Sequence, residues 1–269
     1  MGKLDGQVAI VTGGAWGIGG ADLIFPINRG LYFGLGVEGG MTVLKQSPFF
    51  EDENRTAWAT YDVEKANALL DEMGLFEPWY LNRHLRIELD AAQKSTLEAV
   101  FQLLIDSALE QPRVFVHRDY HSRNLMLVDD NNPGVIDYQD AVIGPVTYDL
   151  VSLFKDCYIE WPRDTVENWL DQYLQHTAVV IPENRSRFIR WFDLMGVQRH
   201  LKVLGIFARL NYRDGKSQYL HDLPLTLKYV VDACKQYEEL SPLLGLLEKL
   251  LPFGANSSLV SLIVIAGKR

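Results

Sequence analysis

The sequence predicts an α+β fold in which helices predominate and the strands are short. Residues 62–74 and 91–110 have the periodicity of amphipathic helices, because their apolar side chains recur on one face at helical spacing. Short apolar runs with the length of strands follow at residues 113–116, 125–128 and 135–137. A turn rich in Asp, Asn and Gly at residues 129–134 indicates that the last two runs form a hairpin.

Each predicted helix has its own local signals. Asp62 can cap the start of the first helix and Gly74 can end it. In the second helix, the side chains expected to face inward are Leu97, Val100, Leu103 and Leu104. A further helix is predicted over residues 191–210, where Arg199 and Lys202 share a face because they are three residues apart.

Composition limits the class of protein. The chain has 269 residues, of which 48% are hydrophobic and 23% charged, and it carries a net charge of −9. An acidic chain is a poor candidate for binding nucleic acid through phosphates. No apolar run reaches the length of a membrane span, and two cysteines, Cys157 and Cys234, favour a reducing, cytoplasmic setting over a disulfide framework.

Glycine and charge divide the chain into three predicted segments. Residues 1–55 form a glycine-rich head with short strands, residues 56–252 an acidic, mostly helical body, and residues 253–269 an apolar tail strand. The head holds the run TGGAWGIG at residues 12–19, after an apolar stretch with the character of a strand. Spaced glycines after a strand let backbone N–H groups approach a phosphate.

The run at residues 12–19 resembles the opening of short-chain dehydrogenases and implies, as one alternative, an NAD(P)-dependent oxidoreductase. Two features favour a structural strand and turn instead. Pro26 interrupts the helix that should follow Gly19. Tyr61 and Lys65 have the residue types and the spacing of that family's catalytic Tyr-x-x-x-Lys pair. They lie too close in sequence to the glycines at residues 12–19 for that role.

A second glycine cluster comprises Gly34, Gly36 and Gly39, and Lys45 follows on an apolar run. Protein-kinase-like enzymes place such a loop over the phosphates of ATP and a lysine on the strand beyond it. Only five residues separate Gly39 from Lys45. This is fewer than a β-hairpin usually needs between the glycine-rich loop and the strand that carries the lysine. A cofactor-binding loop and an ordinary flexible loop both remain open interpretations.

The pattern with the strongest chemical implication begins at His117. Asp119 follows the apolar run 113–116, Asn124 comes five residues later, and Asp137 lies beyond the predicted hairpin. Asn124 and Asp137 flank that hairpin and can meet at its open end. Their oxygen atoms suit Mg²⁺, and a carboxylate at Asp119 can face a substrate hydroxyl. This set matches the needs of phosphoryl transfer.

Residues 58–252 resemble the aminoglycoside phosphotransferase and choline kinase superfamily, in particular the bacterial N-acetylmuramate/N-acetylglucosamine kinases of cell-wall recycling. The phrases that carry the resemblance include PWYLNRHL at 78–85, VFVHRDY at 114–120, RNLM at 123–126 and GVIDYQDA at 134–141. The resemblance implies a protein-kinase-like fold with a mostly helical C-terminal lobe. The β-rich N-terminal part of that fold is expected to be truncated or replaced in this chain.

The resemblance also implies roles for matched residues. Asp119 is the expected catalytic carboxylate, and His117 is expected to support the catalytic loop. Asn124 and Asp137 are the expected Mg²⁺ ligands in a complex with ATP, and Asp149 is expected to brace the loop through hydrogen bonds. Polar residues in the matched segments are candidates for contact with the substrate: Gln139, Asp140, Asp156, Arg199, His200 and Arg209.

The function expected on this basis is ATP-dependent phosphorylation of a hydroxyl group on an amino sugar. A cationic helix face that includes Arg199 and Lys202 could meet an anionic sugar substituent, although a salt-bridged face explains it equally well. A catalytically inactive, chimeric kinase-like protein is the remaining alternative to a kinase and to an oxidoreductase. A small-molecule sugar is the expected partner, with no nucleic acid and no membrane.

Overall fold

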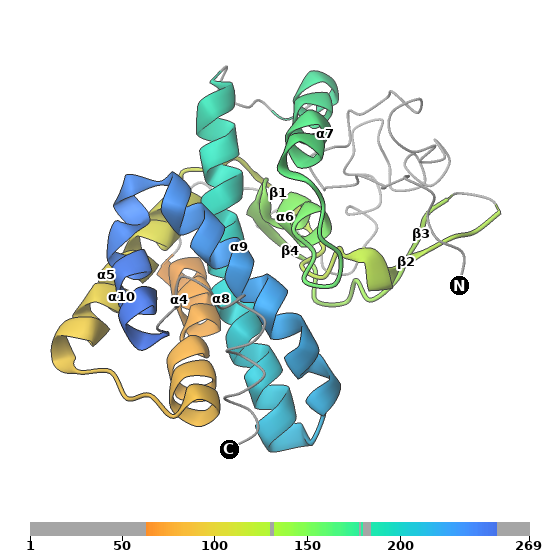
Figure 1. Cartoon of the computed structure of the whole chain (residues 1–269). Helices are drawn as coiled ribbons and strands as arrows, with labels where there is room; N and C mark the ends of the chain where they lie inside the picture. Colours follow the sequence, from red (N-terminus) through yellow and green to blue (C-terminus); the bar gives the residue numbers. More distant parts are fainter. Residues whose placement is uncertain (1–62, 130–131, 178, 180–183, 252–269) are drawn as a thin grey trace. The chain divides into compact units, whose positions relative to one another are not determined.

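A computed structural model describes residues 63–129, 132–177, 179 and 184–251, and the structural statements below refer to these residues. They confirm an α+β fold dominated by helices (Figure 1). The predicted head and the predicted tail strand lie outside the described residues, as do the glycine motifs and Lys45. In chain order the elements are α4 (Val63–Met73), η3 (Phe76–Leu85), α5 (Ala91–Leu109), β1 (Arg113–Val116), η4 (Ser122–Asn124), β2 (Leu125–Met126), β3 (Gly134–Val135), β4 (Val142–Pro145), α6 (Tyr148–Phe154), α7 (Arg163–His176), α8 (Arg185–Asp214), η5 (Ser217–Asp222), α9 (Leu223–Gln236), η6 (Glu238–Leu240) and α10 (Ser241–Leu250).

The described chain divides into two compact units. The first unit contains Gln111–Phe192, and the second joins Val63–Glu110 to residues 193–251. Helix α8 contributes its first residues to one unit and the rest to the other. Each unit is described by itself below.

Short antiparallel strands and two helices build the first unit. Strand β1 pairs with β4, and β2 pairs with β3. Helix α6 is buried along its whole length, and its Phe154 packs on Trp169 of α7 with ring centroids 5.1 Å apart. Because β1 and β4 are antiparallel, Pro145, shortly before α6, lies opposite Arg113 at the start of β1.

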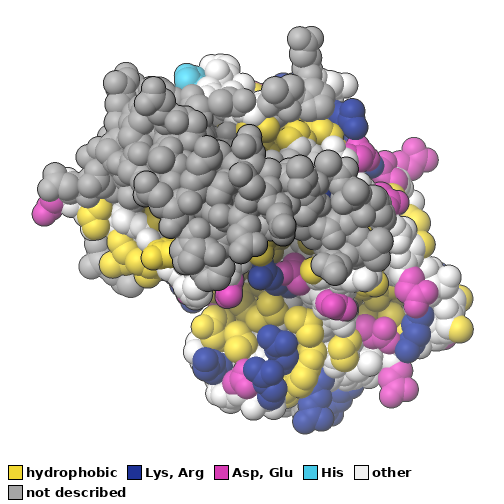
Figure 2. Space-filling view, turned by 180° about the vertical axis from the view of Figure 1, so that it is seen from behind, with side chains coloured by type: hydrophobic (Ala, Val, Ile, Leu, Met, Phe, Trp, Pro, Cys, Tyr) yellow, Lys and Arg dark blue, Asp and Glu magenta, His cyan; other side chains and the backbone are white. Residues whose placement is uncertain are grey.

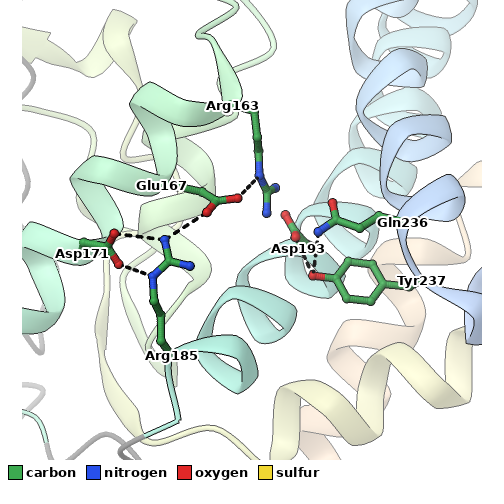
Figure 3. Close-up of polar contacts among 7 residues, drawn as sticks. All are labelled: Arg163, Glu167, Asp171, Arg185, Asp193, Gln236 and Tyr237. Carbon is green, nitrogen blue, oxygen red and sulfur yellow. Dashed lines mark hydrogen bonds and ion pairs between the residues drawn. The ribbon is translucent and has the colours of Figure 1, made fainter.

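A network of ion pairs joins α7 to the beginning of α8 (Figure 3). Arg185 Nε donates to Asp171 at 2.5 Å, and Arg185 Nη2 donates to Glu167 at 2.9 Å. Arg163 also donates to Glu167, at 2.7 Å. Hydrogen bonds from Arg163 and Arg185 lower the pKa of Glu167, so this carboxylate stays ionised in the network.

The hairpin strands are shorter than the sequence predicted. The predicted strand 125–128 ends at Met126, and the predicted strand 135–137 is β3, which ends at Val135. Asp137 has a φ of 67°, in the left-handed region that interrupts a strand. The chain therefore leaves the ladder shortly before the expected metal ligand.

Helix packing builds the second unit. Helix α5 packs against α4 and α10, and α10 packs against α9. The predicted helix 91–110 is confirmed as α5, which begins with a capping box in which Asp90 and Gln93 exchange hydrogen bonds of 2.9 Å. A Cβ atom on Gly205 of α8 would lie 2.5 Å from the backbone carbon of Leu75, so this close approach requires glycine.

Charged side chains of both signs lie among one another on the face of the molecule that Figure 2 shows. Among the described residues, no helix combines the length and the apolar character needed to cross a membrane.

Candidate active site

The loop after β1 carries the predicted catalytic residues and is held by a buried carboxylate. Asp149, in the first turn of α6, is 1% exposed. It accepts hydrogen bonds from the backbone N–H of His117 at 2.7 Å and of Arg118 at 3.1 Å. A buried carboxylate needs such partners because its desolvation is costly. The predicted bracing role of Asp149 is confirmed.

Two residues of the candidate site have a left-handed backbone conformation: Arg118, which precedes Asp119, and Asp137 itself. Arg118 has a φ of 74° and Asp137 a φ of 67°. Residues other than glycine rarely adopt this region, which costs free energy unless the surroundings hold it. At Arg118 the hydrogen bond from its N–H to Asp149 supplies part of that support. The chain is thus bent sharply next to Asp119 and at Asp137.

His117 links the catalytic loop to the segment that precedes Asp137. Its side chain is buried, and its Nε2 lies 3.0 Å from the carbonyl oxygen of Ile136. Burial lowers the pKa of His117, while the carboxylates of Asp119 and Asp137 act in the opposite direction. A neutral ring that donates from Nε2 to Ile136 satisfies this geometry, and it suits the predicted supporting role.

Asn124 and Asp137 meet at the open end of the hairpin, as the sequence predicted. The backbone N–H of Ile136 donates to the carbonyl oxygen of Asn124 at 3.1 Å, which continues the β2–β3 pairing by one step. The Asn124 amide nitrogen lies 3.4 Å from Asp137 Oδ2. It also donates to the backbone oxygen of Asp119 at 2.9 Å. These contacts bring the three predicted residues together.

Asn124 and Asp137 are the predicted metal ligands, and they lie side by side. Among the residues that the structure describes, no group of three or more His, Cys, Asp or Glu side chains could hold a metal ion. Magnesium bound with nucleotide needs one or two protein oxygen ligands, since phosphates and water supply the others. Asn124 and Asp137 carry oxygen atoms of this kind, and that they bind Mg²⁺ stays a prediction.

The remaining first-unit candidates lie close to these groups. Gln139 Nε2 donates to Asp137 Oδ1 at 2.5 Å, so it contacts a predicted metal ligand. Asp140 is exposed in the turn that follows. Asp156 is buried, and it accepts hydrogen bonds from Ser122 and Tyr158. Contact with a substrate stays a prediction for all three residues.

The other substrate candidates belong to the second unit. Arg199 and His200 are buried on α8, and the His200 ring stacks on Tyr229 with centroids 4.9 Å apart. Arg209 lies one turn before Tyr212 on the same helix. Lys202 pairs with Glu72 at 2.8 Å, which favours the salt-bridged interpretation of this helix face at Lys202.

The hairpin has an exposed apolar face that sequence reasoning missed. Met126 is 48% exposed and Ile136 is 47% exposed. Met126 pairs with Gly134, so Met126, Ile136 and Asn124 share one face of the hairpin. The alternation of side chains along residues 125–128 and 135–137 could have shown which residues share a face of the hairpin. The apolar composition of both segments favours buried strands instead, so the exposure of this face was not predicted.

Comparison with known proteins gives one family for this region. Residues 50–188 match the family described as "Phosphotransferase enzyme family". Proteins named N-acetylmuramate/N-acetylglucosamine kinase are similar as well. The one from Pseudomonas aeruginosa is 49% identical over 189 residues, 69% of this chain and 55% of that protein. The one from Pseudomonas putida is 52% identical over 182 residues, 66% of this chain and 53% of that protein.

The similarity extends beyond one genus. The protein of the same name from Neisseria meningitidis is 44% identical over 194 residues, 71% of this chain and 57% of that protein. The chain therefore spans about half the length of the curated relatives it matches.

Proposed function

Because the chain belongs to the phosphotransferase enzyme family, we propose that it transfers the γ-phosphoryl group of ATP to a hydroxyl group of an amino sugar. The observation that carries the proposal is the meeting of Asn124 with Asp137 and with the backbone of Asp119. The amino sugar, N-acetylglucosamine or N-acetylmuramate, is proposed from the names of the relatives.

Each residue of the cluster has a distinct role in this proposal. The Asp119 carboxylate orients the attacking hydroxyl and accepts its proton. Asn124 and Asp137 supply the oxygen ligands for Mg²⁺. Bound with ATP, the ion would neutralise charge on the phosphates. His117 and Asp149 keep the loop in place, so the reacting groups are held before substrate binds.

The exposed apolar face supplies a surface for the base of the nucleotide. Met126 and Ile136 lie on the same face of the hairpin as Asn124. An aromatic base gains free energy when it covers exposed apolar side chains. Met126 and Ile136 are the proposed contacts for the adenine ring of ATP.

Other parts of the expected site remain part of the proposal. Lys45, Gly34, Gly36 and Gly39 are the proposed contacts to the phosphates. Two sets of residues stay proposed candidates for contact with the sugar, each within its own unit: Gln139, Asp140 and Asp156 in the first unit, and Arg199, His200 and Arg209 in the second. A cytoplasmic location goes with this activity, because ATP is a substrate.

The first test is calorimetry with Mg·ATP, followed by phosphorylation of N-acetylglucosamine and N-acetylmuramate. We expect Asp119→Asn to lower kcat by about 10²–10⁴-fold while Mg·ATP still binds, since it removes a proton acceptor. Asp137→Ala should abolish metal-dependent nucleotide binding. The matched control is Asp164→Asn, an exposed acidic residue at the start of α7, which should behave like the wild type.

Two results would contradict the proposal. One is unchanged Mg·ATP affinity in Asp137→Ala, which would remove the metal ligand assignment. The other is a melting temperature that rises with NADH and ignores Mg·ATP, because a ligand that binds the native state raises its apparent stability. That second result would favour the oxidoreductase alternative.

A further inference from the structure

Asp156 is a buried carboxylate whose hydrogen bonds come from the protein itself. It is 2% exposed and lies two residues after the end of α6. Its Oδ2 accepts hydrogen bonds from the backbone N–H of Ser122 at 3.0 Å and from the Ser122 hydroxyl at 2.5 Å. Its Oδ1 accepts from the backbone N–H of Tyr158 at 2.9 Å. Both oxygens of Asp156 therefore hold the chain, and two of these three bonds go to Ser122.

Ser122 is the first residue of η4, the single helical turn that ends at Asn124. A turn of three residues has no cooperative stability of its own. The residue before it, His121, makes no capping hydrogen bond with its side chain. Asp156 takes the place of a cap, since its oxygen accepts the first N–H of the turn from 34 residues away.

Tyr158 holds the same turn through its ring. The Arg123 guanidinium carbon lies 3.4 Å from the centroid of the Tyr158 ring, which is a close cation–π contact. The His121 ring meets the Tyr158 ring edge-on, with centroids 5.5 Å apart. Residues 156–158, which we call the 156–158 segment, thus contact each of the three residues that precede Asn124.

We propose that Asp156 is a positioning residue for the metal ligand Asn124 and acts on it through Ser122. This inference rests on the proposed function, because it assigns Asn124 to the metal. When the turn is held at Ser122, the Asn124 side chain stays within reach of Asp119 and Asp137. Residues that orient a metal ligand in this way affect metal affinity without touching the ion. This role is an alternative to the sugar contact proposed for Asp156 above, and the test below decides between the two.

The test compares Asp156→Asn with Asp164→Asn, which makes the same change of charge at an exposed site. Apparent Mg²⁺ affinity is measured by calorimetry as Mg²⁺ is added to protein with ADP. We expect Asp156→Asn to weaken Mg²⁺ binding by roughly 10–100-fold, with the KM for N-acetylglucosamine unchanged. Ser122→Ala removes one of the two bonds to Asp156 and should act in the same direction with a smaller effect.

Hydrogen exchange provides a readout that needs neither metal nor activity. In Asp156→Asn, amides of the peptide that contains residues 122–124 should lose protection, while those of α6 and α7 keep theirs. Unchanged exchange at 122–124 overturns the inference. So does intact Mg²⁺ binding with a raised KM for the sugar, which would return Asp156 to a substrate contact. Failure of the wild type to bind Mg·ADP would overturn the proposed function instead, and exchange at 122–124 would still decide whether Asp156 holds the turn.

Discussion

The two units use buried polar groups in different ways. In the first unit, Asp149 and Asp156 accept hydrogen bonds from backbone N–H groups of the loop that follows β1. In the second unit, contacts join side chains of different elements. The half-buried Lys202 pairs with Glu72, and Tyr237 donates to the buried Asp193 (Figure 3). Asp149 and Asp156 therefore fix the backbone of a loop, whereas Lys202 and Tyr237 join elements through their side chains.

This difference follows from what each unit contains. Helices satisfy their backbone groups internally, so they need only packing and a few side-chain contacts to stay together. Loops have no such internal partners, and loops carry the predicted catalytic residues here. Buried carboxylates supply what the loop cannot supply itself, including support for the left-handed backbone at Arg118.

The largest effect is expected when Asp149 is replaced. Asp149→Ala leaves two backbone N–H groups, the buried one of His117 and the partly buried one of Arg118, without their acceptor. Hydrogen bonds to charged groups contribute about 1.5–3 kcal/mol each, so we expect a loss of at least about 3 kcal/mol in the free energy of unfolding. Urea denaturation measures it. Tyr237→Phe in the second unit loses one side-chain bond to Asp193 and should cost about 1 kcal/mol; equal losses would refute the contrast between the units.

An intermediate effect is expected at Gly205, where the second unit depends on close helix packing. Gly205→Ala would place a Cβ 2.5 Å from the Leu75 backbone, so the free energy of unfolding should fall by about 1–3 kcal/mol. Gly245→Ala in α10 is the matched control, since a Cβ added there would meet no atom within 4 Å. There the better helix propensity of alanine should stabilise the protein by about 0.5–1 kcal/mol. If both variants were stabilised, the packing of α8 would not depend on the close contact between Gly205 and the backbone of Leu75.

The smallest effect is expected in the pH dependence of stability. His84 is buried in the second unit, its Nδ1 lies 3.1 Å from the Tyr212 hydroxyl, and burial lowers its pKa. The unfolded chain then binds a proton more readily, so stability is full above the ordinary histidine pKa and is lost as the pH falls below it. Titration of His84 alone can change the free energy of unfolding by at most about 1.4 kcal/mol per pH unit.

The comparison of His84→Gln with His221→Gln isolates that contribution. His221 is an exposed histidine of η5 in the same unit. Urea denaturation at pH 7.5 and pH 5 should show a smaller loss on acidification for His84→Gln than for the wild type. His221→Gln should follow the wild type. An unchanged loss in His84→Gln would show that other groups govern the acid response.

Local patterns predicted much of the fold. The helices 62–74 and 91–110 correspond to α4 and α5, and the strand 113–116 has the bounds of β1. Helix α8 begins at Arg185 and ends at Asp214, beyond the predicted 191–210 on both sides. Helix ends depend on packing and on hydrogen bonds as well as on periodicity, as the ion pairs of Arg185 with α7 illustrate.

The sequence alone predicted the helices 62–74 and 91–110, the central part of α8, the hairpin turn and the meeting of Asn124 with Asp137, because these depend on residues close together along the chain. Only the tertiary structure decided that Asp156 bonds to Ser122, 34 residues away, and that Lys202 pairs with Glu72, 130 residues away. A carboxylate in isolation can accept a hydrogen bond from any donor. Its partner is selected by the path of the chain, which brings one donor into reach and excludes water around it.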